Sequence, residues 1–276
     1  MGHLHCANPC LRSETWGTRF VLLQGGYAGV CAVVWDRSAT ESVRLRCKTI
    51  GLIGGMSWES SSEYYRLLNE SVRAHRGGLH SAPCLLLSVD FNEIAALQRA
   101  GDWDELTKKM IACAKTLETA GAEMVLICTN TMHKMADEVE AEISIPLVHI
   151  ADVTAARIQK AGLKKVGLLG TLYTMEQAFY RERLARSYGL EVLIPEQEER
   201  ETVHRVIFSE LCLGKTLDSS REMYREIIRG LVERGAEGII LGCTEIMLLI
   251  SAEDCPVPMF DTTAIHVAAA LELALE

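Results

Sequence analysis

Short apolar runs alternate with longer amphipathic stretches along the chain from about residue 48 onward. The apolar runs are predicted strands at 49–54, 85–89, 124–127, 165–169, 190–194 and 238–241. The amphipathic stretches predict helices from Ser57 through Leu68 and at 102–120, 129–140, 152–160, 175–188, 199–211, 218–234 and 263–275. Because strands that alternate with helices form parallel sheets covered on both faces, the pattern predicts an α/β fold.

The second half of the chain repeats the order of the first. A cassette that opens with Gly-Ala-Glu, continues as an apolar run and ends in Cys-Thr occupies 121–131 and recurs at 235–245. Cys128 lies 74 positions after Gly54, and Cys243 lies 73 positions after Gly170. We therefore expect two pseudo-symmetric lobes, each a parallel sheet flanked by helices. The predicted boundaries are 48–150 plus 258–276 for the first lobe and 151–257 for the second.

Residues 1–47 contain neither half of the repeat, so we expect an extension that is not part of the fold. Its apolar run at 20–35 resembles the core of a secretion signal, but it contains Gln24 and lacks a cleavage site. It is also too short to span a membrane. An upstream start or a non-native leader is the simpler explanation. A group of possible metal ligands has no standard spacing, and we predict no metal there: His3, His5, Cys6 and Cys10.

Charge and cysteine usage narrow the class of protein. The 276 residues carry a formal charge of −9 without a dense Lys/Arg stripe, which argues against a nucleic-acid partner. The ten cysteines are scattered and include no Cys-x-x-Cys, which argues against zinc ribbons and thioredoxin-type motifs. Reduced thiols in a cytoplasmic protein, with no membrane association, are the expected state.

Two cysteines occupy equivalent positions at the ends of buried strands. Ligands bind beyond the carboxyl ends of strands in such sheets, where Cys128 and Cys243 are placed. A helix that starts after each cysteine would stabilise a thiolate and receive a substrate carboxylate. Inverting an α-carbon requires an acid–base group on each face, which two thiols provide. The hypothesis is a two-base amino-acid racemase, and it needs a cleft between the sulfurs that is wide enough for one amino acid.

Polar residues around the two cysteines are candidates to bind the substrate. Donors around the carboxylate would stabilise the carbanion, and the candidates are Thr129, Asn130, Thr131, Thr171 and Thr244. Glu245 could orient or deprotonate Cys243, bind the substrate ammonium, or simply favour the first turn of a helix. No lysine lies in a context typical of pyridoxal phosphate, so we predict no cofactor.

Other motifs have simpler interpretations. The glycines of 51–55 lack the third glycine and the acidic residue of a dinucleotide fingerprint, so we interpret them as turn residues at a small-ligand site. His133 is expected to be a surface or half-buried helix residue, and His149 and Asp261 occupy matching repeat positions. Isolated cysteines are interpreted as small buried hydrophobes, namely Cys31, Cys84, Cys113 and Cys212.

From Lys48 to Glu276 the chain resembles the aspartate/glutamate racemase family, whose members work without pyridoxal phosphate. The resemblance rests on Ile53–Ser60, Cys128–His133 and Gly242–Glu245, and Tyr173–Gln177 is similar to the branch with broad amino-acid specificity. It implies a homodimeric cytoplasmic enzyme with its active site between the lobes. It also implies that the two cysteines exchange protons with the substrate. The pocket residues that the resemblance adds are Met56 and Gln98, beside the 128–131 run, and Ser57 is a further candidate to bind the substrate.

Two departures from the family pattern bear on specificity. Glutamate racemases carry a histidine where this chain has Glu245, and archaeal aspartate racemases carry an arginine after the second strand, where this chain reads Asp90-Phe91-Asn92-Glu93. We therefore expect neutral or mixed amino acids rather than strict aspartate specificity. The alternatives are a decarboxylase or cis–trans isomerase of the same superfamily, a non-catalytic binding protein for a small ligand, and a redox dithiol switch.

Overall fold

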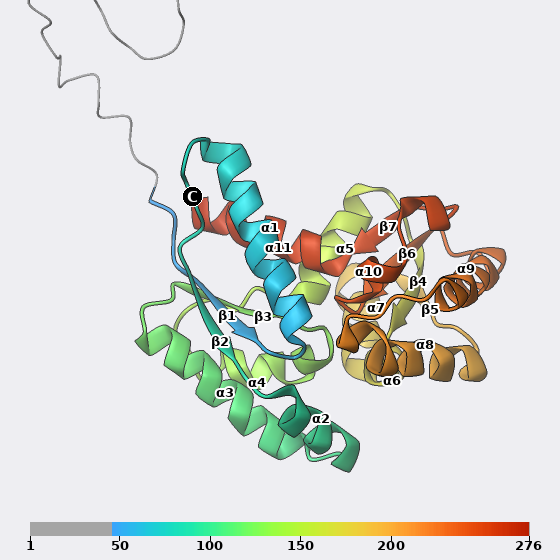
Figure 1. Cartoon of the computed structure of the whole chain (residues 1–276), viewed down its shortest axis with the longest axis horizontal. Helices are drawn as coiled ribbons and strands as arrows, with labels where there is room; N and C mark the ends of the chain where they lie inside the picture. The colour runs from blue at the N-terminus through green and yellow to red at the C-terminus, as the bar shows by residue number, and fades with distance from the viewer. Residues whose placement is uncertain (1–45, 276) are drawn as a thin grey trace, which may run out of the picture. The chain divides into compact units, whose positions relative to one another are not determined.

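The computed structural model describes residues 46–275 (Figure 1). The apolar run at 20–35, Cys31 and the candidate metal ligands His3, His5, Cys6 and Cys10 lie outside the described residues. Cys47, predicted to precede the fold, is buried in a core cluster with Ile50 and Leu52.

The first sheet is parallel and has three strands in the order β2-β1-β3. They are β1 (Ile50–Gly54), β2 (Cys84–Ser88) and β3 (Met124–Ile127). Alternate residues point to opposite faces, so Ile50 and Leu52 pack in one core cluster while Ile53 packs in another. The helices around this sheet include α1 (Trp58–Arg76), α2 (Phe91–Ala100), α3 (Trp103–Thr119) and α4 (Ala136–Glu140).

The second sheet is also parallel, with four strands in the order β5-β4-β6-β7. They are β4 (Lys165–Gly170), β5 (Glu191–Leu193), β6 (Gly238–Gly242) and β7 (Met259–Asp261). Its helices include α5 (Ile150–Lys160), α6 (Leu172–Glu176), α7 (Ala178–Tyr188), α8 (Gln197–Ser209), α9 (Asp218–Glu233) and α10 (Ile246–Leu249). In each sheet the first strand of the repeat is central, and the predicted α/β fold with two parallel sheets is confirmed.

The repeat extends to the fourth strand and to the helix that follows it. β7 pairs with β6, and its counterpart in the first sheet is an isolated parallel bridge between Val125 and Leu147. The C-terminal segment at 258–276, predicted to join the first lobe, is divided. β7 belongs to the second sheet, whereas α11 (Thr262–Leu275) contacts α1 and α5 (Figure 1).

Several elements differ from the prediction. The helix expected over 175–188 is divided into α6 and α7, and neither α10 nor β7 was predicted. α2 was not predicted, although Asp90 accepts a hydrogen bond from the Asn92 N–H at its start, and Gly101 ends it with φ 72°. The continuous helix expected up to Glu140 is instead a 3₁₀ helix over Thr131–Met135 followed by α4. Asn130 makes no capping hydrogen bond there.

The matching positions His149 and Asp261 share one structural role. The His149 Nδ1 accepts from the Ala151 N–H at 3.2 Å, at the start of α5. The Asp261 carboxylate accepts from the N–H groups of Thr263 and Ala264 at 2.9 and 3.2 Å, at the start of α11. Both side chains therefore cap the helix that follows the last strand of their repeat unit.

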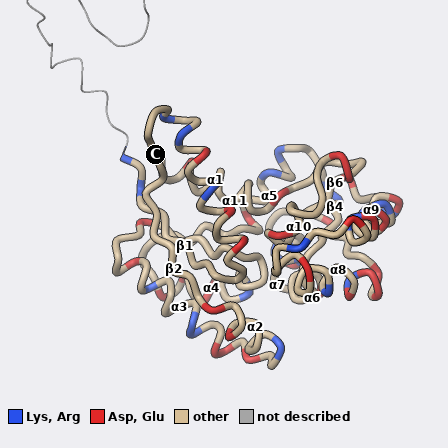
Figure 2. The backbone as a smooth tube through the Cα atoms, in the orientation of Figure 1, with Lys and Arg blue, Asp and Glu red and all other residues tan. Residues whose placement is uncertain are grey.

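Over the part of the chain that the structure describes, Lys and Arg are intermixed with Asp and Glu and gather into no stripe (Figure 2). Among residues 46–275 no helix is both long and apolar enough to cross a membrane. The same residues contain no group of three or more His, Cys, Asp or Glu placed to hold a metal ion.

Three buried imidazoles lie together behind the end of β3. The ring of His133 lies 4.7 Å from that of His149 and 5.7 Å from that of His266, centroid to centroid. His266 is fully buried between the Tyr64 hydroxyl at 2.8 Å and the Val148 carbonyl at 2.7 Å. Burial lowers the pKa of His133 to about 4 and that of His266 to about 3, so both are neutral at pH 7.

Acid is expected to destabilise this fold through these histidines. Above pH 6.5 they are neutral in both states, and as the pH falls towards 4 only the unfolded chain takes up protons. The free energy of unfolding should fall by up to about 1.4 kcal/mol per pH unit for each histidine in that window. Urea unfolding of wild type, His133→Asn and the exposed-site control His80→Asn tests this between pH 7.5 and 5. An identical pH slope for wild type and His133→Asn would contradict it.

Candidate active site

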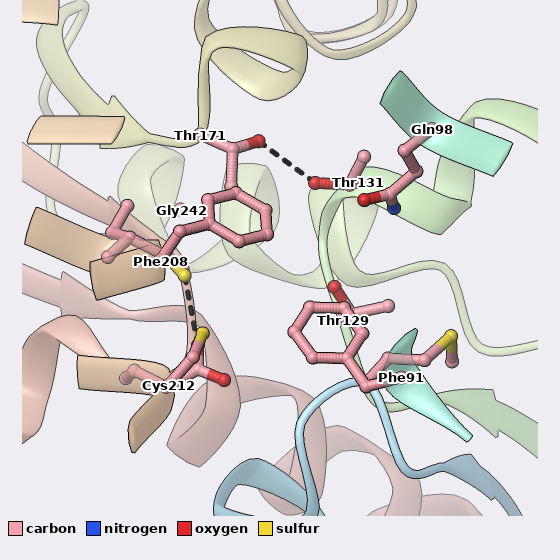
Figure 3. Close-up of a pocket in the computed structure, with 12 residues that line it drawn as sticks. Phe91, Gln98, Thr129, Thr131, Thr171, Phe208, Cys212 and Gly242 are labelled. Carbon is pink, nitrogen blue, oxygen red and sulfur yellow. Dashed lines mark hydrogen bonds between the residues drawn. The ribbon is translucent and has the colours of Figure 1, made fainter. Parts of the chain in front are cut away.

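A small cavity lies where the carboxyl ends of the two sheets meet, and residues of both repeats line it (Figure 3). Its volume is about 20 Å³, which is room for one water molecule. The lining residues are Met56, Phe91, Gln98, Thr129, Thr131, Thr171, Ile207, Phe208, Cys212, Gly242, Cys243 and Glu245.

Close approach of β4 and β6 fixes the position of Cys243. A Cβ on Gly242 would lie 2.9 Å from the Leu169 carbonyl oxygen, and a Cβ on Gly170 would lie 2.9 Å from the Gly242 oxygen. Only glycine fits at both positions, because a larger residue would push the strands apart at the edge of the cavity. Cys243 follows directly and faces the cavity from the second sheet.

A buried carboxylate joins Cys243 to the first lobe. The Cys243 thiol donates to Glu245 Oε2 at 2.9 Å, and the Thr244 hydroxyl donates to the same oxygen at 2.8 Å. The Ser57 hydroxyl, at the start of α1, donates to Glu245 Oε1 at 2.7 Å. Glu245 is 2% exposed, and its carboxylate is held by three hydrogen-bond donors, Cys243, Thr244 and Ser57.

Three threonines join the lobes on another side of the cavity. The Thr131 hydroxyl lies 3.0 Å from that of Thr171 and 3.2 Å from that of Thr174 (Figure 3). Thr171 also accepts from the Thr174 N–H and caps α6. Hydroxyls that both donate and accept can exchange these mutual bonds for bonds to a ligand.

Cys128 is not among the cavity-lining residues. It is 1% exposed and belongs to the core cluster of Tyr64, Met124 and Leu126, while the next residue, Thr129, lines the cavity. The cleft between the two sulfurs that the sequence hypothesis requires is therefore not present in this conformation.

The prediction that helix N-termini favour the thiolates is wrong for this conformation. Burial raises the pKa of the Cys128 thiol, and burial with the nearby Glu245 charge raises that of Cys243. The helices cannot offset this burial, since the first after Cys128 is a short 3₁₀ segment and α10 has only four residues. Both sulfurs are thiols at pH 7.

The structure separates the predicted substrate-binding residues into two groups. Those that line the cavity are Met56, Gln98, Thr129, Thr131, Thr171 and Glu245. Ser57, Asn130 and Thr244 lie behind it, where Ser57 and Thr244 hold Glu245. Asn130 is 1% exposed and donates to the Thr262 hydroxyl at 3.0 Å, but its Oδ1 has no partner.

Several lining residues were missed by the sequence hypothesis. Phe91 belongs to the unpredicted α2, and Ile207 and Phe208 lie on the last turn of α8. Cys212, interpreted as a small buried hydrophobe, is half-buried on the cavity wall, where burial and Glu245 raise its pKa. Asp90 before Phe91 and Gly101 ten residues later were cap signals that could have identified α2.

The position of His133 was also predicted wrongly, because it is 3% exposed. Its Nδ1 lies 2.8 Å from the Thr129 carbonyl oxygen, and its Nε2 accepts from the Ile150 N–H at 3.2 Å. A neutral ring with its hydrogen on Nδ1 satisfies both bonds and fixes the backbone after Cys128.

Comparison with known proteins identifies the family. Residues 53–270 match the model of the Asp/Glu/Hydantoin racemase family. The chain is 25% identical over 163 residues to the broad specificity amino-acid racemase RacX of Bacillus subtilis, covering 59% of this chain and 70% of RacX. A crystal structure from Yersinia pestis, assigned to the Asp/Glu racemases, is 54% identical with a TM-score of 0.78. An aspartate racemase homologue from Pyrococcus horikoshii is 39% identical with a TM-score of 0.73. Each alignment covers 83% of this chain and 100% of the other. The chain therefore belongs to the Asp/Glu/Hydantoin racemase family.

Proposed function

We propose that the protein racemises free amino acids of broad range, without a cofactor, by moving the α-proton between Cys128 and Cys243. The observation that carries the proposal is the contact of the Cys243 thiol with the buried Glu245 carboxylate, inside a cavity formed by both repeats. Cys128 holds the equivalent strand-end position in the first sheet, one residue before the cavity wall. Membership of a racemase family supports the reaction class.

In the proposed reaction Cys243 must first lose its proton. Glu245 Oε2 is its hydrogen-bond partner and the only carboxylate on the described cavity wall, so it is the proton acceptor. An arriving substrate ammonium near Glu245 would lower the cost of a thiolate that burial otherwise disfavours. The thiolate then removes the α-proton, and the Cys128 thiol returns a proton to the other face.

The carbanion would be stabilised through the substrate carboxylate. The hydroxyls of Thr131 and Thr171 are available if they give up their mutual bond, and Thr129 lies on the same wall. Asn130 lies behind the cavity wall, so its unpartnered Oδ1 would accept from the substrate ammonium only once the lobes open. These groups contact the ends of the amino acid that all substrates share, which is consistent with broad specificity.

Substrate entry requires the lobes to separate. A cavity of about 20 Å³ holds a water molecule but no amino acid. Opening would break the Ser57–Glu245 and Thr131–Thr171 bonds and would let the Cys128 thiol turn towards the substrate. Substrate would then replace the broken bonds as the lobes close.

Each cysteine should be essential for racemisation. Cys128→Ser and Cys243→Ser should lower kcat by at least about a thousandfold, because each removes the acid–base group of one face. The measurement is chiral chromatography of products, together with α-deuterium uptake from each enantiomer. A control, Cys255→Ser, changes a half-buried cysteine outside the cavity and should keep full activity. Full turnover by either of the first two variants would refute the mechanism.

Glu245→Gln should separate proton transfer from binding. The amide oxygen can still accept a hydrogen bond from one side of the site, the NH2 group that replaces the other oxygen can only donate, and neither group can take the thiol proton. We expect a loss of about a hundredfold in kcat/KM in both directions, since the equilibrium constant is one. Deuterium uptake should be lost chiefly for the enantiomer whose proton Cys243 removes. Ser57→Ala, which leaves the carboxylate in place, is the matched variant and should lose far less. Equal losses for Ser57→Ala and Glu245→Gln would leave Glu245 a purely structural role.

We also propose that the enzyme works as a homodimer in the cytoplasm. Trp58 and Tyr65 on α1 are 67% and 54% exposed, and Leu86 on the edge strand β2 is 46% exposed, which favours a covered surface. All the cysteines described by the structure are free thiols, which is typical of a reducing compartment. Light scattering should give twice the chain mass of 30.5 kDa. A monomer at micromolar concentration would contradict the first part.

A further inference from the structure

The residues that line the candidate cavity are of two chemical kinds. Thr129, Thr131, Cys243 and Glu245 supply hydroxyl, thiol and carboxylate groups, while Phe91, Phe208, Ile207 and Met56 supply apolar surface. An amino acid has the same division between its charged α-centre and its side chain. If the α-centre takes the polar wall, the side chain is directed to the apolar one.

Two phenylalanines from different lobes meet on the apolar wall. Phe91 is the first residue of α2, and Phe208 lies near the end of α8. Their rings are stacked, with centroids 6.0 Å apart and planes 17° from parallel (Figure 3). Because each lobe supplies one ring, separating the lobes separates the stack and opens space between the rings.

Further aromatic contacts hold the stacked rings of Phe91 and Phe208 in place. The His204 ring lies 4.8 Å from that of Phe208 and 5.8 Å from that of Tyr173. Tyr173 in turn lies 5.5 Å from Trp103, which is back in the first repeat. The aromatic contacts thus cross between the lobes twice, at Phe91–Phe208 and at Trp103–Tyr173.

The one charge among the described lining residues is negative, and it excludes substrates with acidic side chains. Within the described residues, none of those lining the cavity is Lys, Arg or His, and Glu245 is the one carboxylate. An aspartate or glutamate side chain would be desolvated beside a like charge, which raises its free energy. Glu245 already accepts hydrogen bonds from Cys243, Thr244 and Ser57, and in the proposed reaction it also faces the substrate ammonium, so it is not free for a lysine or arginine side chain.

We propose that Phe91 and Phe208 form the side-chain subsite, and that they select amino acids with uncharged, apolar side chains. The rings part as the lobes open and close on the substrate side chain, so their size sets its size. This inference rests on the proposed racemase function and adds the substrate class and two specificity-determining residues to it.

The test is kcat/KM for racemisation of leucine, methionine, phenylalanine, aspartate, glutamate, lysine and arginine. Wild type should favour leucine or methionine over aspartate by at least about a hundredfold, because the acidic chain finds no cation. Phe91→Ala and Phe208→Ala should lower kcat/KM for leucine by about tenfold and raise the phenylalanine-to-leucine ratio. Phe208→Leu should keep the wild-type order of substrates and guards against a folding defect in the alanine variants.

The matched control is Phe179→Ala, since Phe179 packs against Tyr180 outside the cavity and should leave the substrate ratios unchanged. Preference for aspartate or glutamate would overturn the proposal. So would preference for lysine or arginine, which would indicate the unpartnered Glu59 Oε2 as the partner of a cationic side chain. Unchanged substrate ratios in folded Phe91 and Phe208 variants would overturn it as well.

Deuterium uptake at the α-carbon separates this inference from the function on which it rests. Wild-type protein that exchanges the α-proton of no amino acid refutes the racemase proposal itself. Exchange confined to aspartate and glutamate keeps the racemase and refutes the apolar subsite. Exchange of leucine or methionine, lost in Cys128→Ser and Cys243→Ser, supports both.

Discussion

The buried negative charge of Glu245 is the constraint on which the active site depends. A carboxylate that is 2% exposed, without a paired cation, is unfavourable by several kcal/mol unless donors surround it. The donors are Cys243 and Thr244 from its own lobe and Ser57 from the other. The charge therefore favours the closed arrangement of the lobes, because opening removes one donor. In the proposed mechanism a substrate ammonium would replace that donor, which would couple binding to the movement of the lobes.

The same burial decides the state of the thiols. A helix N-terminus favours a thiolate by a modest, local effect, whereas full desolvation raises the thiol pKa by several units. Burial raises the pKa of both thiols, and the nearby charge of Glu245 raises that of Cys243 further. The resting enzyme of the proposed mechanism consequently carries two thiols, and the base is generated only when a positive charge enters the site. Such an arrangement also protects the sulfurs from oxidation between turnovers, since thiols react far more slowly than thiolates.

The sequence predicted the structural features that depend on local patterns of apolar and polar residues. The strands, their parallel pairing and the equivalence of Cys128 with Cys243 follow from apolar runs and from the repeat, and the structure has those elements within a residue or two. The contact between Phe91 and Phe208 could not be predicted from the sequence, because the two rings meet only when the lobes pack together. Their positions in sequence, 117 residues apart, carry no signal of that contact. His133 was misplaced for a similar reason, since its partners Thr129 and Ile150 enclose it only in the folded chain.

One of the differences between the two repeats makes the two halves chemically unequal. Cys128-Thr129 is followed by Asn130, whereas Cys243-Thr244 is followed by Glu245. An amide donates and accepts hydrogen bonds but takes up no proton at neutral pH. A carboxylate can accept the hydrogen bond of a thiol and can also take up its proton. Only Cys243 thus has a neighbour able to receive its proton. In a two-base cycle the sulfurs exchange roles with every turnover, so one base suffices to hold the spare proton. An inversion of the opposite sense would let Glu245 return its proton to Cys243, whereas repeated turnover in one sense would require Glu245 to release its proton to solvent and Cys128 to regain one. The proposed asymmetry thus sets the resting state without favouring either enantiomer.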